Sequence, residues 1–151
     1  MKKLNLPAYE FKLKQEGKKT KIFDALRKKE LVLTPEEWVR QHVVKFLIEE
    51  RNFPKGLIGL EKSLKLNGLT KRADILVYGR NAKPLFMVEC KAPEVKITQA
   101  VFDQVSRYNI SLKLPYLMVT NGLKHFCAKI NFTENKFHFL KEIPYFEELT
   151  S

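Results

Sequence analysis

Two acidic residues and one lysine in the middle of the chain have types and spacing that suit hydrolytic chemistry. Asp74 sits early in one apolar segment, and Glu89 and Lys91 lie at the end of the next. Side chains alternate between the two faces of a strand, so Glu89 and Lys91 share a face and Cys90 points to the other. If the segments pair as a hairpin around a turn near Asn81, Asp74 and Glu89 lie equally far from that turn. Two carboxylates and an ammonium group would then meet at one place on a sheet.

Such a group favours a divalent cation. Two neighbouring carboxylates in apolar surroundings repel each other, and hard oxygen ligands suit Mg²⁺ or Mn²⁺. A metal can activate water and neutralise the charge that builds on a phosphoryl group, while Lys91 orients that water or stabilises the same charge. The backbone carbonyl of Cys90 would point toward this site and is a further candidate ligand. The alternative is a surface ion pair between Glu89 and Lys91, because Glu-x-Lys is a common tripeptide.

The surrounding residues predict one α/β domain with a central mixed β-sheet flanked by helices. Thr34 is placed to cap a helix, with proline next and an acid three residues on. Asn67-Gly68 predicts a hairpin turn. A strand–helix–strand unit between residues 85 and 120 predicts a right-handed crossover between parallel strands. The predicted elements are a helix (34–51), three strands (57–66, 71–78 and 85–91), a helix (97–110), two strands (116–120 and 125–130) and an edge strand (137–140).

The first part of the chain differs from the rest in composition, because it is rich in lysine and has few apolar residues. We expect residues 1–33 to form a basic arm and residues 34–151 to form the globular domain. Residues 1–30 contain ten Lys/Arg and four Asp/Glu, which is +6 of the formal net charge of +11. Local patterns predict a short edge strand at 9–13 and one helical turn at 22–26.

Composition excludes several classes of protein. With 151 residues, 44% hydrophobic and 30% charged, the chain resembles a soluble globular protein that can close a core without disulfides. No apolar run approaches the roughly 18 residues that cross a bilayer, and no long apolar region follows the first lysines. We therefore expect a cytoplasmic protein.

Cys90 and Cys127 lie in apolar stretches without metal-ligand spacing, which predicts small buried residues. The positive charge favours nucleic acid as a partner, although a charge that serves only solubility is equally compatible.

The pattern of Asp74 and Glu89-Cys90-Lys91 across a hairpin resembles the PD-(D/E)XK nuclease signature, with Ala73 at the place of its proline. The flanking sequence is similar to the nuclease domain at the amino terminus of type I restriction enzyme R subunits over roughly residues 34–130. The similar segments are TPEEWVR (34–40), KRADI (71–75), VECKAP (88–93), QVSRYN (104–109) and TNG (120–122).

This resemblance implies a restriction-endonuclease-like core with the order α-β-β-β-α-β-β. It makes Asp74 and Glu89 the metal ligands and Lys91 the catalytic lysine, with Mg²⁺ or Mn²⁺ as cofactor. It also makes Glu37 a further metal-shell or water-positioning group. Glu36, in the same helical turn, competes for that role.

The resemblance places a second helix beside the site. Gln104 and Tyr108 match a Gln-x-x-x-Tyr element of related nucleases, and their i, i+4 spacing puts both on one helix face. Four basic residues flank the proposed site and are candidate phosphate contacts: Lys71, Arg72, Lys96 and Arg107.

The sequence therefore predicts a Mg²⁺-dependent DNA endonuclease. It contains no Gly-x-x-x-x-Gly-Lys-Ser/Thr motif, so we expect no ATP site in this chain and no ATP-driven restriction by it. A homodimer and separate restriction-system subunits are both open as partners. The alternative function is a catalytically silent module that binds nucleic acid or a protein partner on the same scaffold. Sensitivity of activity to EDTA distinguishes the two.

Overall fold

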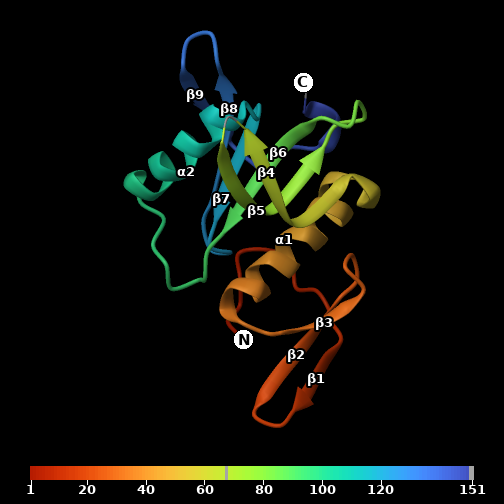
Figure 1. Ribbon diagram of the computed structural model, residues 1–151. Helices are drawn as coiled ribbons and strands as arrows, with labels where there is room; N and C mark the ends of the chain where they lie inside the picture. The colour runs from red at the N-terminus through yellow and green to blue at the C-terminus, as the bar shows by residue number, and fades with distance from the viewer. Residues whose placement is uncertain (67, 150–151) are drawn as a thin grey trace.

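A computed structural model describes residues 1–66 and 68–149, with only the backbone described at 66, 69, 108, 110 and 111. Asn67 of the predicted hairpin turn therefore lies outside the described residues. Two sheets and two long helices make up the fold (Figure 1). Short 3-10 helices occur at Lys55–Leu57 and Phe146–Glu148. No helix of the described chain is long and apolar enough to cross a membrane.

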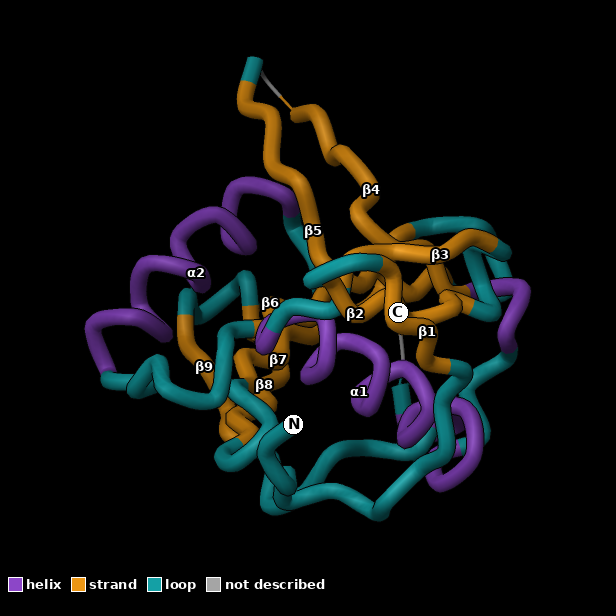
Figure 2. The backbone as a smooth tube through the Cα atoms, turned by 90° about the horizontal axis from the view of Figure 1, so that it is seen from below, coloured by secondary structure: helices purple, strands orange, loops and turns teal. Residues whose placement is uncertain are grey.

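The large sheet has six strands in the order β4-β5-β6-β7-β8-β9, and all neighbours are antiparallel except β6 and β7. The parallel pairing of β6 with β7 across a helix confirms the predicted crossover between parallel neighbours. Figure 2 shows that the hairpin of β4 and β5 projects beyond the body of the domain. The strands are β4 (Ile58–Leu66), β5 (Leu69–Tyr78), β6 (Pro84–Cys90), β7 (Tyr116–Thr120), β8 (His125–Asn131) and β9 (Lys136–Phe139).

Two helices cover the large sheet on opposite faces. Helix α1 (Pro35–Arg51) packs Val43 and Leu47 into one apolar core, and α2 (Gln99–Leu112) packs Phe102 into another. Strand β6 separates the two cores and is buried along its length after its first residue. The order of helices and strands predicted from residue 34 onward is confirmed.

Helix α1 begins and ends where its terminal residues dictate. The side chain of Thr34 accepts a hydrogen bond from the backbone N–H of Glu37 at 3.0 Å, and Pro35 occupies the first helical position. At the other end, Asn52 adopts a left-handed conformation with φ of 61°. The capping residues therefore fix the first turn of α1, which carries Glu36 and Glu37.

The beginning of the chain forms a second, three-stranded antiparallel sheet that lies beyond α1 from the large sheet (Figure 1). Gly17, with φ of 63°, makes the tight turn between its first two strands. The central strand is buried at Ile22 and Asp24. We call this element the small sheet; its strands are β1 (Leu13–Glu16), β2 (Lys19–Asp24) and β3 (Lys29–Val32).

Two predictions for this region are wrong. The helical turn expected at residues 22–26 is instead the end of a strand, because Ile22 pairs with Leu13 on one side and with Leu31 on the other. The edge strand expected at residues 9–13 begins only at Leu13. The aromatic rings that precede it pack against α1, as the 4.9 Å separation of the Phe11 and His42 ring centroids shows.

Candidate active site

Strands β5 and β6 bring Asp74 and Glu89 to the same place on the large sheet. Ile75 lies opposite Val88 in the antiparallel register, so the next pair along is Asp74 and Glu89. The backbone N–H of Cys90 donates a hydrogen bond to Oδ2 of Asp74 at 2.7 Å, which ties this carboxylate to the end of β6. The convergence expected from the hairpin is therefore present in the structure.

Lys91 follows β6 directly. Its backbone N–H donates to the carbonyl of Thr120 at 2.8 Å, which extends the pairing of β6 with β7 by one residue. Burial raises the pKa of both Glu36 and Glu89, and the charge of the half-buried Lys91 side chain partly opposes that rise. The ammonium group of Lys91 and the carboxylates of Glu36, Asp74 and Glu89 therefore interact where β5, β6 and the first turn of α1 meet.

Glu89 has the most perturbed environment among these acids. Its side chain is only 7% exposed, and Oε2 lies 3.5 Å from Nζ of Lys71. Its other oxygen, Oε1, is buried without a hydrogen-bond partner. Burial and then the charge of Asp74 raise the pKa of Glu89 to about 7, against the lowering effect of Lys71 and Lys91. A buried carboxylate oxygen without a partner is costly to keep, and a cation would satisfy it.

The donor set is suited to a cation that takes only part of its coordination shell from protein. In the part of the chain that the structure describes, no three His, Cys, Asp or Glu side chains gather as a metal-binding group. The carboxylates of Asp74 and Glu89 could offer two hard oxygen ligands. Mg²⁺ typically uses one or two carboxylates and completes its shell with waters and substrate phosphates, so these residues fit it. The predicted role of the Cys90 carbonyl as a ligand stays a prediction.

The two acids of the first helical turn lie in different surroundings. Glu36 is the one whose charge interacts with those of Asp74 and Lys91, and the expected role of Glu37 at the site stays a prediction. Burial and the charge of Asp74 raise the pKa of Glu36, while Arg40 and Lys91 lower it. The distinction arises because α1 turns adjacent residues by about 100°, so that neighbouring acids face different surroundings.

Glu37 belongs to a buried polar cluster under the small sheet. Its Oε2 accepts a hydrogen bond from Nε2 of Gln41 at 2.8 Å and lies 3.4 Å from the guanidinium of Arg27. The guanidinium of Arg40 lies 3.7 Å from its other oxygen. These partners give Glu37 a structural role in joining the small sheet to α1.

Glu61 is a residue near the site that the sequence did not reveal. Located on β4, it accepts hydrogen bonds from Arg40 at 2.8 Å and Arg72 at 2.7 Å, and it lies 3.4 Å from Arg27. The hydrogen bond from Arg40 is the largest cause of its lowered pKa. Its φ of 51° is strained for a residue with a side chain, and it lies in β4 between Leu60 and Lys62, which pair with the two β5 neighbours of Asp74. No local pattern in a charged, alternating strand distinguishes such a residue.

The remaining candidates lie in varied surroundings. Lys71 and Arg72 have carboxylate partners within the chain, Glu89 and Glu61, and their expected contact with phosphate stays a prediction. The other two phosphate candidates, Lys96 and Arg107, are exposed.

Exposed Gln104 lies on α2, and among the described residues no hydrogen bond or ion pair joins it to the site. The side chain of Tyr108 lies outside the described part of the chain. Cys90 and Cys127 are buried, in agreement with the prediction of small buried residues, and burial raises the pKa of both thiols.

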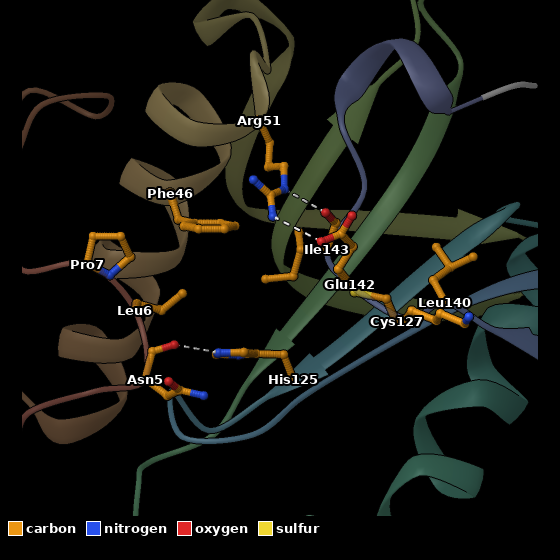
Figure 3. A pocket seen from close by; sticks show the side chains of 11 residues that line it. Asn5, Leu6, Pro7, Phe46, Arg51, His125, Cys127, Leu140, Glu142 and Ile143 are labelled. Carbon is orange, nitrogen blue, oxygen red and sulfur yellow. Dashed lines mark hydrogen bonds and ion pairs between the residues drawn. The ribbon is translucent and has the colours of Figure 1, made fainter.

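A pocket elsewhere on the domain is unrelated to this chemistry. About 250 Å³ of space lies between the first residues of the chain, the end of α1 and the segment after β9 (Figure 3). Arg51 crosses it to donate a hydrogen bond to the carbonyl of Ile143 at 2.7 Å, and His125 lies 3.0 Å from the carbonyl of Asn5. None of the predicted site residues lines this pocket.

A protein-family model identifies the domain. The model for the N terminus of the type I restriction enzyme R protein matches residues 35–144, which span α1, β4 to β9 and the whole candidate site. This chain belongs to that family. The family assignment from the quoted motifs is thus confirmed for this R-protein N-terminal domain. No curated protein matches the chain.

A solved structure supports the fold. The chain resembles a fragment structure described as an HsdR subunit of a type I restriction enzyme from Vibrio vulnificus YJ016, with a TM-score of 0.55 and 23% sequence identity. The match covers 78% of this chain and 24% of the other, so the R-protein N-terminal domain spans about a quarter of that relative's length. At this identity the likeness shows a shared fold.

Proposed function

We propose that this R-protein N-terminal domain is a nuclease that uses Mg²⁺ or Mn²⁺ to hydrolyse phosphodiester bonds of DNA. The observation that carries the proposal is the buried carboxylate of Glu89, with one unpartnered oxygen, opposite Asp74 at the strand end that leads into Lys91. A purely structural domain would gain little from keeping these charges together on an apolar strand, because burying them has a cost.

The acidic residues would bind the cation. Asp74 and Glu89 supply carboxylate oxygens, with the Cys90 carbonyl as a further candidate ligand. When bound, the cation would lower the pKa of a coordinated water and neutralise charge on the phosphoryl group. Lys71 balances the charge of Glu89 in the metal-free chain, since their charged atoms lie 3.5 Å apart.

Lys91 and Glu36 would act on the water and the phosphate. The Lys91 ammonium is placed to hold the attacking water or to stabilise the negative charge of the transition state. Glu36 extends into the same charged group and is suited to accept a hydrogen bond from that water, either directly or through the cation's shell. Arg40 keeps Glu36 in place, because its guanidinium lies 3.7 Å from Oε1 of Glu36.

DNA is the substrate class that the charge distribution favours. The projecting hairpin of β4 and β5, which leads to the site through Asp74, carries exposed Lys62, Lys65 and Arg72. Exposed Lys96 and Arg107 are further candidate phosphate contacts. We propose that the substrate is duplex DNA and that the domain works with other restriction-system subunits or as a homodimer.

The proposal is tested by incubating supercoiled plasmid with purified protein at low salt. We expect conversion to the nicked circle in Mg²⁺ or Mn²⁺ and no conversion in EDTA. Tight binding without nicking in any metal would contradict the nuclease and favour the silent DNA-binding module. A heat-denatured sample of the same preparation is the control for a contaminating nuclease.

The two acids of the first helical turn are expected to differ in their effects. Glu36→Gln should reduce metal-dependent nicking by roughly 10- to 100-fold with little change in stability, as for residues that support a metal site. Glu37→Gln should instead lower the free energy of unfolding by about 2 kcal/mol, because a buried charged hydrogen-bond acceptor is removed. Nicking rates and urea unfolding of both variants measure this. Equal nicking rates for Glu36→Gln and the wild type would remove Glu36 from the site.

A further inference from the structure

The small sheet carries much of the basic charge of the chain on a small area. Residues 11–32 contain eight Lys/Arg and three Asp/Glu, a net charge of +5. One of the three acids, Asp24, is buried. Six lysines of the small sheet are exposed: Lys12, Lys14, Lys18, Lys19, Lys28 and Lys29.

Folding alone does not account for how these charges are arranged. Lys14 lies directly opposite Lys21 in the register of β1 and β2, and like charges in that position destabilise a sheet. Lys12 lies on the same face, with its ammonium 5.7 Å from the centre of the Phe23 ring. This face points away from buried Ile22 and Asp24, since side chains alternate along β2. A polyanion bound there would relieve the repulsion.

The charge is held in a fixed position rather than on a loose arm. Asp24 is 1% exposed, and its Oδ1 accepts hydrogen bonds from the backbone N–H groups of Leu26 and Arg27, both at 2.9 Å. Its Oδ2 accepts another from Nε2 of Gln41 at 3.2 Å, which connects the small sheet to α1. The lysines therefore keep a set direction relative to α1.

The attachment of the small sheet is also next to the candidate active site. Arg27, between β2 and β3, lies 3.4 Å from Glu61, whose neighbours in β4 pair with the residues on either side of Asp74. It lies 3.4 Å from Glu37 as well, one residue from Glu36. The small sheet extends from there past α1, away from the large sheet (Figure 1).

From these observations we infer that the face of the small sheet that carries exposed Lys12, Lys14 and Lys19 binds the phosphate backbone of a DNA duplex whose neighbouring segment lies at Asp74 and Glu89. This inference rests on the proposed function, which it extends by assigning a duplex-holding surface outside the catalytic residues. The lysines bind phosphates, so they position the duplex without reading its sequence.

The test compares two triple variants that remove equal charge. Lys14, Lys18 and Lys19 are replaced by glutamine in one, and exposed Lys124, Lys136 and Lys141 are replaced by glutamine in the other. Binding of a fluorescent duplex is measured by anisotropy in EDTA over a salt series. For the small-sheet variant we expect at least about tenfold weaker binding at low salt and a salt slope reduced by about 0.9 for each phosphate that is no longer neutralised. The other variant should stay close to the wild type in both quantities.

The outcomes separate this inference from the proposed function. Equal affinity and equal salt slope for the two triple variants would overturn the inference, even if the wild type nicks plasmid in Mg²⁺. A wild type that binds duplex, depends on the small-sheet lysines and never nicks would support the inference and contradict the nuclease. Because the substituted lysines are exposed, unchanged circular dichroism melting curves are expected, and these show that weaker binding does not result from unfolding.

Discussion

Replacement of Lys91 by alanine is expected to slow Mg²⁺-dependent nicking of plasmid by about 100-fold or more, the usual cost of removing one preorganised charge from a transition state. The half-buried ammonium of Lys91 acts on both Glu36 and Glu89, so it lies where charge would develop on a phosphoryl group. The effect should fall on the rate at saturating substrate. Initial rates of conversion from supercoiled to nicked plasmid measure it.

The matched control is Lys83→Ala. Lys83 precedes the other end of β6 and is exposed, so its replacement removes the same charge from the chain away from the site. Its nicking rate should stay within about twofold of the wild type, as is usual for a surface substitution. Equal rates for Lys91→Ala and Lys83→Ala would mean that Lys91 has no catalytic role.

Glu89→Gln is expected to stabilise the metal-free domain at pH 8 while it abolishes nicking. The pKa of Glu89 is raised from 4.5 to about 7, chiefly by burial. Between pH 4.5 and 7, Glu89 stays protonated in the folded chain but ionises in the unfolded chain. The folded chain therefore loses stability relative to the unfolded chain as the pH rises through this range. The neutral amide avoids that loss, which is roughly 3 kcal/mol at about 1.4 kcal/mol per unit of pKa shift, with the opposing effect of Lys71 already included in the shifted pKa.

The measurement is urea unfolding in EDTA at several pH values. The difference between Glu89→Gln and the wild type should be largest above pH 7 and should shrink toward pH 4, where both side chains are neutral. The exposed Glu147→Gln should show no such dependence. A difference that grows toward low pH, or none at any pH, would contradict the description of Glu89 as a buried, poorly compensated carboxylate.

Much of the domain could be predicted because its signals are local. The Thr34 cap and the apolar period after it define α1, and the continuous apolar run of β6 reflects burial on both faces. Asp74 and Glu89 could be placed together because the turn and the apolar pattern set the hairpin register, and the shift between Val77 and Tyr78 moves it only slightly. The parallel pairing of β6 with β7 followed from general rules for strand–helix–strand units.

Other features depend on contacts between distant residues. The small sheet has few apolar residues, and Ile22 becomes a strand residue only because strands on both sides pair with it. Adjacent Glu36 and Glu37 look alike in sequence, and the rotation of α1 against β5 and the small sheet decides which one faces Asp74. Glu61 acquires its importance from arginines 11, 21 and 34 residues away in sequence, namely Arg72, Arg40 and Arg27.

The most direct test of the two-carboxylate metal site is calorimetric titration of Mn²⁺ into a complex of the domain with a short DNA duplex. The Lys91→Ala chain is used so that the duplex stays intact, and the titration of duplex alone is subtracted. We expect Mn²⁺ binding by this complex that disappears when Asp74→Asn or Glu89→Gln is added and remains when Glu147→Gln is added. Mn²⁺ binding that is absent before these changes, or unaltered by the first two, would contradict a metal site at Asp74 and Glu89.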